Sequence, residues 1–373
     1  MHVGYAVSFQ NPAEHKSDRE VYETEIALID AAVESGFESI WVVEHHFTDY
    51  FLSPDPVQFL TWCAARYPDV RLGTGVIVLP WHDPVRCTEQ IAMLDNLSDG
   101  RMILGIGRGL GKVEYDGFRV DMNTSRERFV EYAQLILDGL ESGTVEADGE
   151  FIKQPRRDIR PRPVHSFRGR TYAASMSPEA MPIMAELGVG VLVVPQKEWT
   201  AVAEDLGRYR SAWTDCHGAD VPPPAPLCAG NIVLHADAAT AEELAHRYIG
   251  GYYHSVIEHY GFNENAHAGV RGYEFYAGIG KHVERRGLDG AAADYVDLMP
   301  WGTPDQVLDK LSTLRDLLGM AAFNPSFNFA DMPGEVAHGS LSLFATEVLP
   351  VLKEWQTEEL AAVRPRESLA PVS

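Results

Sequence analysis

The chain has few positive charges, few cysteines and no long apolar run. Its 373 residues include 31 lysines and arginines against 54 aspartates and glutamates, which gives a net charge of −23. A surface of this sign repels the phosphate backbone of nucleic acids and anionic membranes. We therefore expect neither nucleic acid nor a membrane as a partner. Any anionic cofactor must then be held by a local arginine or by a helix N-terminus.

The cysteines lie far apart in the sequence, at Cys63, Cys87, Cys216 and Cys228. No Cys-x-x-Cys pair occurs, so we expect neither a disulfide framework nor a metal site. The longest apolar runs fall well short of the ~18 residues that a membrane helix needs, and no basic region precedes the first of them. These features predict a cytoplasmic protein without an export signal or a membrane span.

Short β-branched runs alternate with longer segments of helical spacing, a pattern typical of repeated βαβ units around a parallel sheet. We expect eight strands, over residues 2–8, 39–43, 69–79, 101–106, 171–174, 190–194, 229–234 and 321–329. Eight units favour a closed α/β TIM barrel, (β/α)8, over an open doubly wound sheet. We assign this barrel to a single domain over residues 1–363, followed by a flexible tail over residues 364–373.

Helical spacing predicts helices between the early strands, over residues 18–36, 54–67, 83–100 and 125–140. Asp83 and Pro84 have the residue types of an N-cap and a first helical position. Two segments interrupt the rhythm of the barrel. Residues 143–170 are polar and rich in proline and arginine, and residues 260–298 are rich in glycine, histidine and aromatic residues. We expect an insertion at the first and an irregular lid at the second, because long loops are usually functional or disordered.

Polar residues that follow a barrel strand are the first candidates for an active site, because the site of a TIM barrel is built at the carboxyl ends of its strands. The sequence Glu-His-His-Phe at residues 44–47 directly follows the second strand. Since side chains alternate along a strand, one of His45 and His46 should face the barrel mouth. A histidine there can bind a cofactor or act as a base near pH 7. A structural histidine beside a buried Glu44 explains this motif equally well.

A glycine-rich segment ends the fourth strand, at residues 104–111. Its glycines admit a planar ligand or a phosphate close to the backbone, and Arg108 supplies the local positive charge that an anion needs. The spacing is not that of the dinucleotide fingerprint, and the segment does not lie in the first βα turn. We therefore reject a Rossmann fold.

Two further strand ends have weaker signals. After the fifth strand, Ser177 and Pro178 have the residue types of an N-cap and a first helical position, and with Ser175 they could bind an anion. A plain helix cap is the alternative. In the third strand, Gly75 admits a ligand close to the backbone, although an ordinary core strand explains it as well.

Taken together and in this order, these segments resemble the bacterial luciferase-like flavin monooxygenases. The resemblance includes Glu-His-His-Phe-Thr at residues 44–48, Gly-Thr-Gly-Val-Ile-Val-Leu-Pro at 73–80, Asp-Pro-Val-Arg at 83–86, Gly-Arg-Gly-Leu at 107–110 and Asn-Thr-Ser-Arg at 123–126. Beyond residue 170 it is looser and includes Ser-Pro-Glu at 177–179 and the closing helix at 343–350.

The resemblance implies a TIM barrel that takes reduced FMN from a separate flavin reductase. In this family the flavin traps O₂ as its C4a-hydroperoxide and oxygenates an organic small-molecule substrate. By matching motifs, His45 falls on the family's catalytic histidine, with His46 as its neighbour and Glu44 as a hydrogen-bonding support. The family also implies a homodimer and a mobile lid, which here falls on residues 260–298.

The resemblance also implies a cofactor site. The residues that fall in its phosphate region are Arg108, Arg126, Ser175, Ser177 and the backbone around Met176. The Gly75–Val76 bond falls where the family has a non-proline cis peptide beneath the flavin ring. Gly107 replaces the reactive cysteine of luciferase, from which we expect open space beside the flavin and a different substrate pocket, so light emission is not carried over.

Two other functions fit the same barrel. One is an F420-dependent oxidoreductase that transfers hydride without O₂, because the phosphate site can serve either cofactor. The other is a non-catalytic flavin-binding partner subunit, against which His45 argues. The Glu-His-His-Phe and Arg-Gly-Leu segments favour FMN as the cofactor. Our leading hypothesis is an FMN-dependent monooxygenase that acts on a small, largely apolar substrate.

Overall fold

Eight parallel strand positions form a closed barrel in the computed structural model, which describes residues 1–174, 177–264, 266–358 and 360. The strands are β1 (His2–Ala6), β2 (Ser39–Val42), β3 (Arg71–Thr74) with β4 (Ile77–Val78), β5 (Met102–Gly107), β8 (Thr171–Ala174), β9 (Gly190–Val193), β10 (Leu227–Asn231) and β13 (Ala322–Ser326). Pairing of β3 with β5 and of β1 with β13 closes the ring. The predicted TIM barrel is confirmed.

The third strand, expected as one strand over residues 69–79, is divided into β3 and β4, and a cis peptide bond lies between them at Gly75–Val76, where the family resemblance implies it. Before the break, Leu72 and Gly73 pair with β5. After it, Ile77 and Val78 pair with the same strand further along. The break therefore lies at the carboxyl end of the barrel, where the site residues gather.

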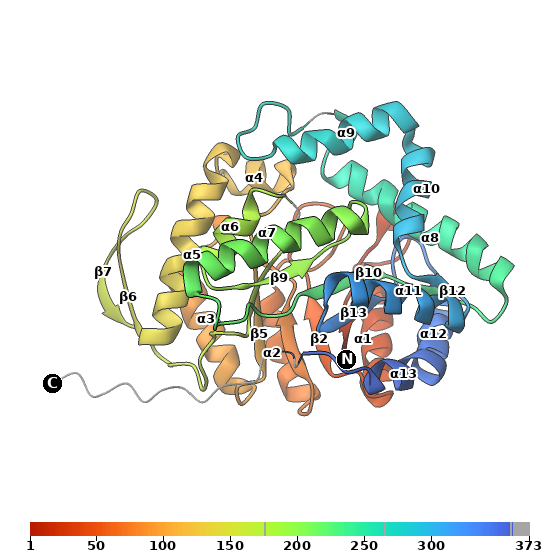
Figure 1. The fold of residues 1–373 in the computed structure, drawn as a ribbon, viewed down its shortest axis with the longest axis horizontal. Coiled ribbons are helices and arrows are strands. Elements are labelled where there is room, and N and C mark those ends of the chain that lie inside the picture. Colours follow the sequence, from red (N-terminus) through yellow and green to blue (C-terminus); the bar gives the residue numbers. More distant parts are fainter. Residues whose placement is uncertain (175–176, 265, 359, 361–373) are drawn as a thin grey trace.

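Helices surround the barrel (Figure 1). They are α1 (Asp18–Glu34), α2 (Pro56–Arg66), α3 (Pro84–Leu97), α4 (Lys112–Phe118), α5 (Ser125–Ser142), α6 (Ala180–Glu186), α7 (Trp199–His217), α8 (Ala238–His259), α11 (Pro304–Leu318), α12 (Gly334–Leu343) and α13 (Leu349–Glu354). The predicted cap of α3 is confirmed, because the Asp83 carboxylate accepts from the amides of Val85 and Arg86. Such caps satisfy the free amides of a first turn and fix where the helix begins.

The polar segment 143–170 contains a hairpin of β6 (Thr144–Asp148) and β7 (Lys153–Asp158). These two strands pair with each other and project to one side of the barrel (Figure 1). The carboxylate of Glu131 on α5 accepts from the amides of Phe151 and Ile152 in the turn region. This carboxylate ties the hairpin to the barrel.

The segment 260–298 is not irregular, contrary to the expectation from its composition. It contains a short 3-10 turn (Phe262–Glu264) and the helices α9 (Glu274–Arg286) and α10 (Leu288–Leu298), which lie at the top of Figure 1. Some of its glycines lie outside the helices with positive φ, as at Gly272 (81°) and Gly287 (74°), whereas Gly278, Gly280 and Gly290 lie within α9 and α10. Glycine favours such turns, which do not prevent helices on either side.

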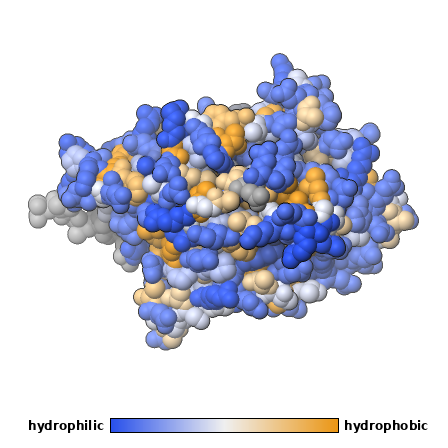
Figure 2. Space-filling view, turned by 90° about the horizontal axis from the view of Figure 1, so that it is seen from above, coloured by the Kyte–Doolittle hydropathy of each residue, from blue (hydrophilic) through white to orange (hydrophobic). Residues whose placement is uncertain are grey.

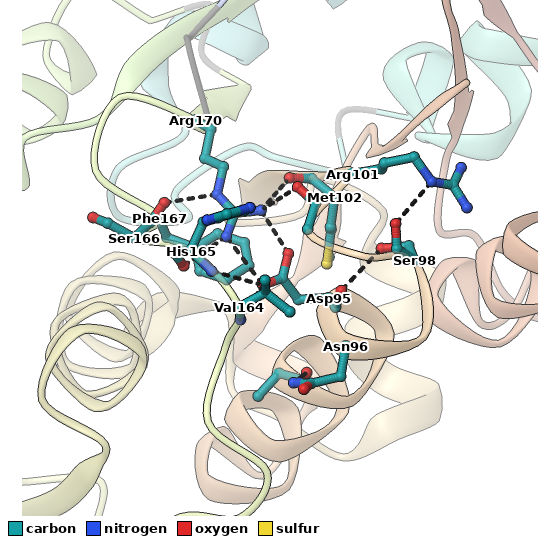
Figure 3. Close-up of polar contacts among 12 residues, drawn as sticks. Asp95, Asn96, Ser98, Arg101, Met102, Val164, His165, Ser166, Phe167 and Arg170 are labelled. Atoms are coloured by element: carbon teal, nitrogen blue, oxygen red, sulfur yellow. Dashed lines mark hydrogen bonds and ion pairs between the residues drawn. The ribbon is translucent and has the colours of Figure 1, made fainter. Parts of the chain in front are cut away.

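A buried ion pair stabilises the amino ends of β5 and β8 (Figure 3). Arg170 is 1% exposed, and its guanidinium donates to Asp95 Oδ1 at 2.6 Å. It also donates to the carbonyls of Met102, His165 and Ser166, each at 2.7 Å. Asp95 Oδ2 in turn accepts from the Val164 amide at 2.8 Å. Burying charge is costly unless partners of this kind surround it.

The face seen from above is mostly hydrophilic, with hydrophobic residues in scattered patches (Figure 2). This surface is consistent with the acidic composition. Among the helices that the structure describes, none combines the length and apolar character required to cross a membrane. The apolar side chains of the core lie between the barrel and its helices, which leaves the strand ends to carry the polar groups described next.

Candidate active site

A cavity of about 200 Å³ opens at the carboxyl ends of the strands. Its walls come from four predicted segments, which contribute His45, Gly75 and Val76, Gly107 and Arg108, and Ser177. Additional lining residues, among others, are Tyr50, Phe51, Trp81, Glu114, Arg126, Tyr252, Tyr260 and Tyr276. The fold therefore brings together segments that are more than 130 residues apart in the sequence.

His45 is the histidine of the pair that lines the cavity. Its Nδ1 lies 3.0 Å from Glu114 Oε1, and its ring stacks on Phe51 with a centroid distance of 5.3 Å. An ionised carboxylate can only accept, so Nδ1 carries a proton in this contact. The other nitrogen, Nε2, is then the one that can accept or release a proton.

Glu114 is a residue of this candidate site that the sequence analysis missed, as is His259. Glu114 lies on α4, is 1% exposed and also accepts from the amide of His46 at 2.9 Å. Burial by itself would raise the pKa of this carboxyl, but the neighbouring rings of His45 and His259 outweigh it and bring the pKa down to about 2. Glu114 therefore stays ionised. Its sequence signal was only an acidic residue just beyond a glycine-rich strand end.

His259, at the end of α8, completes a buried triad with His45 and Glu114. Its Nε2 lies 3.5 Å from Glu114 Oε1, and its Nδ1 lies 2.9 Å from Thr48 Oγ1. Burial lowers the pKa of His259, which opposes its protonation. One potential ligand atom from each triad residue lies within 4.8 Å of the others, the composition of a two-histidine, one-carboxylate site. One hydrogen bond joins the triad, between His45 and Glu114, because among the described residues His259 Nε2 has no hydrogen-bond partner.

Glu44 supports His46 rather than His45. Its carboxylate is buried and contacts His46 Nε2 at 3.1 Å, His82 Nε2 at 2.7 Å and the amide of Val78 at 2.7 Å. Burial alone would raise the pKa of Glu44, but these partners lower it. His46 contributes no lining to the cavity among the described residues. His46 is therefore the structural histidine beside a buried Glu44, and His45 is the histidine that faces the barrel mouth.

Arg108 and Arg126 meet at one end of the cavity, as the phosphate-site prediction requires. The Arg108 guanidinium lies 3.9 Å above the ring of Tyr273, and among the described residues its buried Nη1 has no hydrogen-bond partner. Arg126 Nη2 donates to the carbonyl of Gly272 at 3.3 Å. A buried guanidinium nitrogen without a partner is costly, so this end of the cavity is suited to an anionic ligand.

The segment 260–298 is docked on this arginine pair. The hydroxyl of Tyr273 donates to the carbonyl of Gly109 at 2.9 Å, and His267 Nε2 lies 2.9 Å from the carbonyl of Leu110. Tyr276 on α9 lines the cavity itself. The segment therefore covers the site in this structure.

Two predictions about the anion site need correction or lie outside the structure. Helix α6 begins at Ala180 with Glu179 at its N-cap, so Ser177 is not a cap and Pro178 is not the first helical residue. Ser177 is nevertheless buried and lines the cavity. Ser175 and Met176 lie outside the described residues.

The open space expected at Gly107 is filled. A Cβ at this glycine would lie 2.4 Å from Val76 Cγ2. The side chain that follows the cis bond therefore occupies the place where a larger residue would project. A single sequence could not show this contact, because the two residues meet only across paired strands.

Comparisons with known proteins agree with this geometry. A family model described as luciferase-like monooxygenase matches residues 1–320. The alkanal monooxygenase alpha chain of Photorhabdus luminescens is 27% identical over 366 residues, which cover 94% of this chain and 97% of that protein. The oxygenase component of the flavin-dependent trigonelline monooxygenase of Acinetobacter baylyi is 28% identical over 215 residues, which cover 57% and 59% of the two chains.

A solved structure is similar over nearly the whole fold. The crystal structure of monooxygenase RslO1 from Streptomyces bottropensis has a TM-score of 0.77 and 25% sequence identity to this chain. The match covers 94% of this chain and 100% of that one. The barrel, the family model and these relatives thus all indicate the same protein family.

Proposed function

The chain belongs to the luciferase-like monooxygenase family and is an oxygenating enzyme, and we propose that it uses reduced FMN. A separate reductase would supply the reduced flavin, and the substrate would be a small, largely apolar organic molecule. The relative that is named as an oxygenase component supports the two-component arrangement.

One observation carries this proposal, namely that a single cavity combines a proton-carrying histidine with a partnerless arginine nitrogen. His45 lies on one wall, and Arg108 with Arg126 lies at one end. The arginines suit a phosphate, and the apolar walls beside Gly75 and Val76 suit an aromatic ring. The residues present therefore fit FMN.

Each group of the chain has a role in this proposal. Bound reduced FMN would supply the electrons that activate O₂. Arg108, Arg126 and Ser177 would hold its phosphate, while Phe51, Trp81 and Val76 would exclude water from the reacting centre. His45 would accept or release a proton at Nε2, with Glu114 fixing its ring through Nδ1.

The test mixes the protein with photoreduced FMN without air, admits O₂ and follows the absorption spectrum. We expect a long-lived spectrum that differs from oxidised FMN, with hydrogen peroxide released more slowly than from free reduced FMN. Reduced F420 is the matched comparison. Immediate oxidation of FMN at the free rate, together with F420 turnover that needs no O₂, would contradict the proposal.

We also propose that residues 260–298 act as a lid over the cofactor, since they contact the arginine pair through Gly272 and Tyr273. Limited proteolysis with and without FMN tests this hypothesis. Protection of the segment by FMN is expected, and equal cleavage rates would count against a lid.

A homodimer is the assembly that we infer for this enzyme. Large apolar side chains are exposed on the neighbouring helices α2 and α3, at Trp62, Met93 and Leu97. Light scattering after size exclusion should give twice the chain mass of 41.3 kDa. A monomer at high protein concentration would refute the inference.

A further inference from the structure

A second, smaller cavity lies inside the barrel and adjoins the first. Its volume is about 110 Å³, and Val43, Phe51, Gly75, Val194 and Tyr252 line both cavities. Large apolar side chains form much of its wall, namely Trp41, Leu192 and Tyr295. The two cavities therefore form a chamber in which a ligand of the inner part would lie next to a ligand of the outer part.

One side of the inner cavity is polar. We call Ser8, Asn231, Asn324 and Ser326 the polar floor. Asn324 and Ser326 are two positions apart on β13, so both face the inside of the barrel. Asn231 on β10 is the parallel partner of Ser326 in the strand register. The floor therefore spans two neighbouring strands and the segment that follows β1.

The floor is unusual because side-chain atoms of three of its four residues lack hydrogen-bond partners within the part of the chain that the structure describes. Asn324 is 1% exposed, yet neither Oδ1 nor Nδ2 of its amide has a hydrogen-bond partner among the described residues. The hydroxyls of Ser8 and Ser326 likewise have no hydrogen-bond partner among these residues. Buried polar groups without partners are rare in folded proteins, and each costs stability. Such a cluster inside an otherwise apolar cavity calls for a ligand that completes it.

The fold makes room for this amide. A Cβ at Gly4 would lie 2.3 Å from Asn324 Oδ1, so only glycine allows the carboxamide to lie there. Ser39 Oγ, which also lies beside Gly4, contacts Trp41 Nε1 at 2.8 Å and His2 Nε2 at 2.7 Å. The amide is therefore held inside the barrel, although no described residue forms a hydrogen bond with it.

We propose that the polar floor is the substrate-recognition site of this enzyme, and that it takes a compact ring compound with one carbonyl or hydroxyl oxygen. Asn324 offers a donor and an acceptor, and Ser326 offers both in one hydroxyl. The apolar wall takes the hydrocarbon frame, and the small volume of the inner cavity suits a compact ring better than a long flexible chain. This inference rests on the proposed function, because the outer cavity must hold the flavin for the substrate to lie next to it.

The test measures binding to the flavin-free protein by calorimetry, with three probes. These are 1-tetralone, the matching hydrocarbon tetralin, and the chain aldehyde decanal. The wild-type protein should bind 1-tetralone about tenfold more tightly than tetralin, because a site built for a hydrogen bond rejects the analogue that lacks it. Equal binding of the two ring compounds, tighter binding of decanal or binding of none of the three would overturn the proposal.

Two variants separate recognition from structure. Asn324→Leu should lose the preference for 1-tetralone and still bind tetralin, while its melting temperature stays equal or rises because an unpaired polar group is removed. Ser326→Ala should weaken 1-tetralone binding severalfold, and Ser342→Ala, a half-buried residue of α12 that lines neither cavity, should not change it. An Asn324→Leu protein that keeps the preference, or that melts well below wild type, would show a structural amide and refute the proposal.

The two proposals fail separately. The spectral test with reduced FMN needs no substrate, and the calorimetry needs no flavin. Normal flavin behaviour with no probe preference refutes only the recognition site, whereas probe preference without flavin oxygenation refutes only the proposed function.

Discussion

Two buried polar clusters lie at different heights of the same barrel and differ in how their atoms are paired. At the amino ends of the strands, the Arg170 guanidinium bonds to Asp95 and to backbone carbonyls through every nitrogen (Figure 3). Nearer the carboxyl ends, the amide of Asn324 and the Nη1 of Arg108 have no partner among the described residues.

The difference separates stability from function. A fully paired cluster gains nothing from a ligand. Removing one member of its ion pair leaves the other charge buried without a partner. A cluster with free donors and acceptors beside a cavity lowers stability until a ligand completes it. TIM barrels divide these tasks in the same way, with stability at the amino face and chemistry at the carboxyl face. The predictions below test this division, from the largest expected effect to the smallest.

Replacing His45 by alanine removes the proton-carrying group of the carboxyl face. We expect oxygenation to fall on the order of 10²–10⁴-fold, the usual contribution of a general acid or base, while FMN binding is partly retained. Single-turnover oxygenation and FMN titration measure the two effects. His46→Ala is the comparison, because His46 contacts Glu44 rather than the cavity; an equal loss there would reject the assignment of His45.

Replacing Asp95 by asparagine should break the paired cluster. The free energy of unfolding should fall by about 3–5 kcal/mol, because Arg170 stays buried with its charge uncompensated. Urea denaturation measures the loss. Glu23→Gln removes an exposed ion pair with Arg19 and should cost at most about 1 kcal/mol. A similar small loss at both positions would contradict the division.

Replacing Glu114 by glutamine should give a pH-dependent loss of stability. The pKa of this carboxyl is lower in the folded protein, about 2, than its ordinary value of 4.5. The ionised group therefore stabilises the fold above pH 4.5, and this contribution is lost as the pH falls toward 2. On this linkage the free energy of unfolding of the wild type should exceed that of the variant by on the order of 3 kcal/mol at pH 7.

Denaturation curves at pH 7, 5 and 3.5 measure this difference. The gap between wild type and Glu114→Gln should be constant from pH 7 to pH 5 and narrow at pH 3.5. A gap that widens as the pH falls would show that Glu114 is protonated in the folded protein.

Replacing Arg108 by alanine should weaken FMN binding and leave stability nearly unchanged. The expected loss is about 1.5–3 kcal/mol, typical of hydrogen bonds to a charged group. Quenching of FMN fluorescence measures the dissociation constant. Arg19→Ala, on the exposed face of α1, is the control and should bind FMN normally. Unchanged binding by Arg108→Ala would remove the phosphate site from this end of the cavity.

Local sequence signals were sufficient for much of the fold. The alternation of strands and helices and the Asp83 cap agree with the structure, and the cis bond at Gly75–Val76 agrees with the family resemblance. One failure followed from reading composition alone, and another from a cap pattern that the structure does not use. Residues 260–298 form helices despite their glycines, and Ser177 precedes α6 without capping it.

The sequence by itself determined the barrel and the strand ends at which polar residues gather, because periodicity and caps are local properties. Only the tertiary structure decided which side chains are hydrogen-bond partners. It placed Glu114 on His45 across 69 residues. It also left the Asn324 amide beside Gly4 without a hydrogen-bond partner from the described part of the chain, although 320 residues separate these two. Hydrogen bonds and cavities depend on distances between segments, and a single sequence does not contain these distances.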